Sequence, residues 1–130
     1  MSERAPRAEV FQNLIGRHSG PIVIVNMLKF KADAGDGRTG PQAYADYGDA
    51  VTDILSTYGG EVVWTGRQQE ILTGGPQDDW DVVLLVRYPS VDALARMSAS
   101  PEYRAIYHHR TAALEREAVT AFSENFTLGQ

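Results

Sequence analysis

The chain has no cysteine, and this absence removes several kinds of chemistry at once. Without a thiol there is no disulfide bond, no thiolate metal site and no cysteine nucleophile. The same absence fits a reducing compartment, so we expect a cytoplasmic protein. The 130 residues include 3 histidines, which leaves few side chains that titrate near neutral pH.

Long apolar runs and clusters of basic residues are missing as well. No stretch approaches the ~20 consecutive apolar residues of a membrane-spanning helix. Residues 1–7 are polar and lead into no apolar segment, so we expect no secretory signal. The formal net charge is −5, and the 12 basic residues are scattered. We therefore expect neither a nucleic acid nor a membrane as partner.

The familiar cofactor and metal motifs are also absent. The glycine-rich loop 32–40 lacks the Lys-Ser/Thr end of a phosphate loop and the spacing of a calcium loop. His108 and His109 are adjacent, and on a helix they point about 100° apart, so they cannot chelate one metal as a pair. We therefore expect no metal site and no cofactor.

The most informative segments for the fold and the assembly are residues 22–30 and 81–88. Each has the length of one strand and is rich in β-branched residues, and each is apolar on both of its alternating faces. A strand with one solvated face alternates apolar and polar residues, so both faces of these strands must be covered. In a chain of this size helices can cover one face. We expect a second copy of the same sheet to cover the other, which predicts a homodimer.

The remaining elements predict a fold class. We expect helices over residues 8–17, 41–58, 90–97 and 101–118, and strands over 21–31, 61–66, 70–73 and 81–88. A last strand is expected around Phe122, Phe126 and Leu128. This order is the split βαβ, ferredoxin-like arrangement of an α+β protein, with an antiparallel sheet and helices on one face. The chain reads as one domain, 1–130, with residues 1–20 as an N-terminal helical extension.

Several short segments resemble a known family. They are Tyr44-Ala45-Asp46-Tyr47, Tyr58-Gly59-Gly60, Pro89-Ser90-Val91-Asp92 and Ser100-Pro101-Glu102-Tyr103-Arg104. Together they resemble a group of small bacterial proteins known as domain of unknown function 1330, within the dimeric α+β barrel superfamily. The resemblance implies two ferredoxin-like subunits packed sheet to sheet, each with a cleft between its sheet and its helices. Relatives in that superfamily include cofactor-independent monooxygenases, muconolactone isomerases, haem proteins and stress-responsive proteins.

Two polar residues interrupt apolar patterns and are candidate ligand-binding residues. Arg110 falls near the middle of the apolar stripe of its predicted helix. Either its stem packs while the guanidinium reaches solvent, or the guanidinium points into the cleft and holds an anion. Asn26 interrupts the first two-faced strand, and its amide needs a partner from the protein, from water or from a ligand.

Tyr44, Tyr47 and Tyr103 lie on the inward stripes of their predicted helices. One interpretation places them in the core, and the other gathers their hydroxyl groups at a small-molecule site, with Tyr47 and Tyr103 contacting the substrate. His109 flanks the apolar stripe of its helix. It is a candidate general base or a solvated surface residue, and Tyr44 is the alternative proton carrier.

Two functional classes therefore remain open. The protein is either a cofactor-independent enzyme, monooxygenase-like or isomerase-like, acting on a small organic or carboxylated substrate, or a non-catalytic small-molecule-binding or stress-associated dimer. A strongly perturbed ionisable group in the cleft would favour the enzyme.

Overall fold

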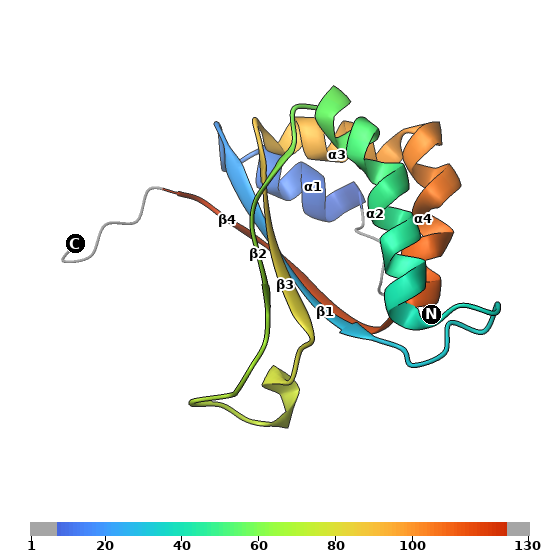
Figure 1. The fold of residues 1–130 in the computed structure, drawn as a ribbon. Helices are drawn as coiled ribbons and strands as arrows, with labels where there is room; N and C mark the ends of the chain where they lie inside the picture. The colour runs from blue at the N-terminus through green and yellow to red at the C-terminus, as the bar shows by residue number, and fades with distance from the viewer. Residues whose placement is uncertain (1–7, 125–130) are drawn as a thin grey trace.

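The computed structural model describes residues 8–124 and places the helices on one side of a four-stranded sheet (Figure 1). This arrangement is the α+β class that the sequence predicted. The elements, in chain order, are α1 (Ala8–Ile15), β1 (Ile22–Phe30), α2 (Gly40–Thr57), β2 (Glu61–Arg67), the 3₁₀ helix η1 (Pro76–Asp78), β3 (Val82–Tyr88), α3 (Val91–Ala99), α4 (Pro101–Ala113) and β4 (Leu114–Phe122).

The strand order is β2-β3-β1-β4, and every neighbouring pair is antiparallel. This is the ferredoxin-like order, so the predicted fold is confirmed. The two strands that are apolar on both faces, β1 and β3, are the two central strands of the sheet. Asn26 of β1 lies opposite Leu84 of β3 and Val119 of β4, so it occupies the middle of the sheet.

The core lies between the sheet and the helices. Alternate residues of β1 point toward the helices, and Ile22, Ile24 and Leu28 among them are buried. Helix α2 begins where the sequence predicts, because the Thr39 hydroxyl accepts a hydrogen bond from the Gln42 N–H and the Gln42 side chain accepts one from the Thr39 N–H. These contacts fix the entry of the longest helix onto the sheet.

None of the helices within residues 8–124 covers the other face of the sheet (Figure 1). Strand registers place on this face the residues that alternate with the buried ones. They are mostly apolar and include Val23, Val25, Met27, Trp64, Val83, Leu85 and Phe122. We call this set the open face. Trp64 of the edge strand β2 and Phe122 of the edge strand β4 are 55% and 53% exposed there.

Two predicted elements differ from the structure. The strand predicted over 70–73 does not form, because the Gln68 side chain accepts from the Trp80 N–H and donates to the Asp78 carbonyl and so closes a loop. The helix predicted to reach residue 118 ends at Ala113, and β4 follows at once and pairs with β1. Phe126 and Leu128, which were predicted in the last strand, lie outside the described residues.

The predicted N-terminal helix is present as α1 and contacts α3. None of its residues is fully buried, but Phe11, Leu14 and Ile15 are partly buried and pack against the core. In the part of the chain that the structure describes, no helix has the length and apolarity to span a membrane.

Candidate functional site

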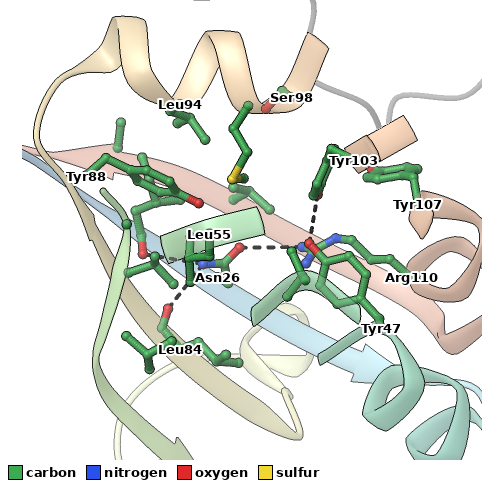
Figure 2. A pocket seen from close by; sticks show the side chains of 18 of the residues that line it. Asn26, Tyr47, Leu55, Leu84, Tyr88, Leu94, Ser98, Tyr103, Tyr107 and Arg110 are labelled. Carbon is green, nitrogen blue, oxygen red and sulfur yellow. Dashed lines mark hydrogen bonds between the residues drawn. The ribbon is translucent and has the colours of Figure 1, made fainter. Parts of the chain in front are cut away.

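A cleft of about 750 Å³ lies between the helix-facing side of the sheet and helices α1 to α4. Its walls are largely apolar, and a polar group of side chains gathers at one end (Figure 2). That polar end contains Asn26, Tyr44, Tyr47, Tyr103, Tyr107, Arg110 and Glu117. The sequence predicted Asn26, Arg110, Tyr44, Tyr47 and Tyr103 as site residues, and the structure brings all five into this one cleft.

An ion pair between Arg110 and Glu117 is the central feature of the polar end. Arg110 lies in the last turn of α4, where a cation is favourable to the helix dipole. Glu117 lies on β4 and points toward the helices. The guanidinium Nη2 donates to Oε1 of Glu117 at 2.8 Å, and the two side chains are 7% and 9% exposed. Both charges are therefore held away from bulk water.

Sequence reasoning missed Glu117 as a site residue. With the helix extended to residue 118, Glu117 had no place on a strand facing the cleft. In the structure it lies opposite Leu28 of β1, on the buried side of the sheet. The directly joined α4 and β4 therefore place two charges seven residues apart in contact.

Asn26 connects the sheet to this ion pair. Its Oδ1 accepts a hydrogen bond from Arg110 Nη2 at 3.5 Å, and its Nδ2 donates to the carbonyl oxygens of Ile24 and Leu84, each at 3.4 Å (Figure 2). All three contacts are long for hydrogen bonds. The amide is therefore partnered by the protein and still faces the cleft.

The tyrosines form a chain of rings along the helix side of the cleft. The Tyr47 and Tyr103 hydroxyl oxygens are 2.8 Å apart and share a hydrogen bond (Figure 2). The Arg110 guanidinium lies 5.5 Å from the Tyr47 ring centroid and 6.0 Å from that of Tyr44, within the range of cation–π contacts. These contacts orient the guanidinium beside Glu117 and Asn26.

Burial sets the protonation state of this cluster. It raises the pKa of Tyr44 to about 12 and also raises the pKa values of Tyr88 and Tyr103 above their ordinary range. Burial alone would lower the pKa of Arg110, but the tyrosine oxygens and the Glu117 carboxylate outweigh it, and the pKa stays above its ordinary value. At neutral pH Tyr44 and Tyr103 are therefore protonated, and the Arg110 guanidinium is charged.

His109 lies outside the cleft, which corrects its prediction as a base for this site. It directly precedes Arg110 in the sequence, points in a different direction, and does not line the cleft wall. Its Nδ1 lies 2.9 Å from the Arg38 Nη1, which also binds the Asp46 carboxylate at 2.9 Å. Burial, the neighbouring His108 and, to a smaller extent, the positive charge of Arg38 lower the pKa of His109. The histidine therefore helps to hold loop 31–39 against α2 and α4.

Among residues 8–124, no group of three or more His, Asp or Glu side chains is arranged to hold a metal ion. What the cleft offers chemically is a carboxylate, a guanidinium, an amide and several phenol groups around an apolar space. These groups can donate and accept hydrogen bonds and exchange protons.

Solved structures share the fold. The chain is similar to the RPA0582 protein of unknown function from Rhodopseudomonas palustris, with 34% identity and a TM-score of 0.84 over 94% of this chain and 96% of that one. It is similar in fold to a dimeric ferredoxin-like protein from Thermobifida fusca, at 14% identity and a TM-score of 0.54 over 82% of this chain and 92% of that one. It is likewise similar in fold to SnoaB, a cofactor-independent oxygenase from Streptomyces nogalater, at 15% identity and a TM-score of 0.54 over 85% of this chain and 99% of that one.

The search of curated proteins returned no match. The family model described as Domain of unknown function (DUF1330) matches residues 38–122, which include α2, α4, Arg110 and Glu117. The RPA0582 likeness extends over nearly the whole chain, including the N-terminal region that the family model leaves out. The protein therefore belongs to the DUF1330 family.

Proposed function

We propose that the protein binds a small organic molecule in the cleft between its sheet and its helices. The observation that carries this proposal is the buried Arg110–Glu117 pair inside a cavity of about 750 Å³. Burying two charges costs more than packing apolar side chains of the same volume, so such a pair adds little to stability. An apolar cleft that ends on a few convergent polar groups is typical of small-molecule sites.

The proposed ligand contacts follow from the geometry. Arg110 and Asn26 lie at the polar end, and the hydroxyl groups of Tyr47 and Tyr103 lie beside them. The apolar walls, which include Leu84 and other residues of the central strands, take the body of the ligand. A non-catalytic binding or stress-associated role needs nothing more than this.

Filling the cleft tests the proposal. Native mass spectrometry of the purified protein should show a bound small molecule, and Val119→Trp should remove it. Val119 lines the cleft and is 43% exposed, so an indole there occupies ligand space without displacing the core. Ala45→Trp, on an exposed position of α2 outside the cleft lining, is the matched control and should keep the ligand. A ligand that survives Val119→Trp would place the binding site elsewhere.

A cofactor-independent enzyme is the second candidate, and the Glu117 carboxylate favours it. In such a reaction Glu117 removes a proton from an acidic C–H or O–H group of the substrate. The new carboxylic O–H bond leaves the negative charge on the substrate, beside the Arg110 guanidinium. The pKa of Tyr44, raised to about 12, keeps this tyrosine protonated. Its hydroxyl group can therefore donate a hydrogen bond to the substrate oxygen that carries the negative charge. The fold likeness to SnoaB is consistent with this candidate.

An enolisable ketone tests the enzyme. With 2-tetralone in D₂O, the wild-type protein should accelerate exchange of the protons next to the carbonyl, as followed by NMR. Glu117→Gln should lose the acceleration, whereas Glu102→Gln, on the exposed first turn of α4, should keep it. Exchange at the buffer rate with wild-type protein would leave binding as the function.

We also propose that the protein is a homodimer through the open face. A monomer would expose the apolar side chains of both central strands, and large contiguous apolar patches of that kind mark interfaces. The dimeric Thermobifida fusca protein shares the fold. Light scattering should give twice the monomer mass, and Val25→Asp or Val83→Glu should reduce it. Ala45→Asp, on the helix layer, should not, and a monomeric wild type would contradict the proposal.

A further inference from the structure

The cleft wall offers no unpaired positive charge. Within the described part of the chain, the charged residues that line it are Arg110, Glu117 and Glu61. Glu117 neutralises Arg110 at 2.8 Å. Glu61 is exposed at the rim and pairs with Arg87 at 3.1 Å. The lining thus contains one cation and two anions, an arrangement that does not attract negatively charged ligands.

A carboxylate ligand would meet a specific obstacle at the polar end. A carboxylate bound to the Arg110 guanidinium would lie near Glu117, so two carboxylates would share one cation, and the side chains of the existing pair are only 7% and 9% exposed. Like charges at such short range repel strongly, and the ligand would also lose its hydration on entering an apolar cleft. Glu117 thus already serves as the anionic partner of the Arg110 guanidinium.

Uncharged polar groups meet no such obstacle. The Tyr47 and Tyr103 hydroxyls share one hydrogen bond and keep further capacity to donate and accept. The Glu117 carboxylate can accept from an O–H or N–H, and the guanidinium can donate to a carbonyl or hydroxyl oxygen. We infer that the cleft selects an uncharged organic ligand, with an apolar body and a hydroxyl, carbonyl or amide head group, and that Glu117 excludes carboxylates. This inference rests on the proposed binding function and narrows its ligand class.

Three probes with the same ring system test the inference: 2-naphthamide and 2-naphthol, which are neutral, and 2-naphthoate, which is anionic. Titration calorimetry at pH 7 should show 2-naphthamide binding the wild-type protein at least about tenfold more tightly than 2-naphthoate, because like charges oppose only the latter. Glu117→Gln should raise 2-naphthoate affinity by about tenfold or more and leave 2-naphthamide within about threefold. Glu102→Gln, which removes one exposed negative charge from α4, should change neither affinity.

The possible outcomes separate the two proposals. Equal or tighter binding of 2-naphthoate by the wild type would overturn the selection of uncharged ligands while leaving the binding function in place. Failure of all three probes to bind either protein would overturn the binding function and the inference with it. If Glu117→Gln does not fold, the ratio of the two affinities in the wild-type protein still decides, because it needs no substitution.

Discussion

Breaking the Arg110–Glu117 pair is the perturbation whose size the structure defines best. The two side chains are 7% and 9% exposed and in contact at 2.8 Å, so removal of either leaves the other charge buried and unpaired. Loss of one partner of a buried pair costs about 3–5 kcal/mol. We therefore expect Arg110→Met and Glu117→Leu each to lower the free energy of unfolding by about that amount. The double variant should be close to the wild type or more stable, because two apolar side chains of similar volume replace the pair.

Urea unfolding of the four proteins, followed by circular dichroism, measures the coupling as a double-mutant cycle. The two single variants should also differ in their response to pH. An unpaired Glu117 can lose its charge by taking up a proton, so Arg110→Met should regain stability as the pH falls from 7 toward 5. An unpaired arginine keeps its charge, so Glu117→Leu should show no such recovery.

Small losses would refute this reasoning. If both single variants lose less than about 1 kcal/mol, the pair behaves like an exposed salt bridge and the cleft admits bulk water to it. If the double variant is as unstable as the single ones, the loss comes from packing rather than from charge. Either result would also weaken the electrostatic basis for excluding carboxylate ligands.

Three further predictions concern packing and pH. Gly40→Ala should lower the free energy of unfolding by about 3 kcal/mol or more, since the new Cβ would lie 1.9 Å from the Lys31 carbonyl oxygen. At Gly48 an added Cβ meets open space, so Gly48→Ala should stabilise α2 by about 0.5–1 kcal/mol. Thermal melts that rank the two variants equally would contradict this prediction. Ile54→Ala should cost about 2 kcal/mol in urea unfolding, because Ile54 is partly buried against the core, and a loss below about 0.5 kcal/mol would mean that α2 is rotated. NMR titration should give His109 a pKa below 6.5, and this pKa should rise in Arg38→Gln. The stability linked to the lowered pKa is present above pH 6.5 and is lost as the pH falls below 6.5. An unchanged His109 pKa in Arg38→Gln would show that Arg38 does not lower the pKa of His109.

Local patterns accounted for most of the fold. The double-sided apolarity of β1 and β3 predicted central strands, and these strands occupy the centre of the sheet. Pro41 and the residues before it predicted where α2 begins, and the Thr39–Gln42 capping contacts form there. The predicted strand over 70–73 failed for a local reason as well, since Gln68 closes that loop by its own hydrogen bonds and Leu72 is 92% exposed.

Residues of the site could be predicted from the sequence only where a polar residue interrupts the apolar pattern of its helix or strand. Asn26 in an apolar strand and Arg110 on an apolar stripe were both visible in this way, and both line the cleft. Glu117 interrupts no such apolar pattern, because residues 112–118 are also compatible with a helix. Pairing with β1 decided that they form a strand, and such tertiary contacts override helix propensity.

The sequence by itself therefore determined most of the elements, the order that makes the fold ferredoxin-like, and the two central strands with apolar faces on both sides. Periodicity and capping are local properties of the sequence. Periodicity specifies which face of each element is buried, and capping specifies where a helix begins. Only the tertiary structure decided that Arg110 meets Glu117 and that His109 meets Arg38 instead of the cleft. Those contacts depend on where one helix ends and how the next strand pairs, and distant parts of the chain set both.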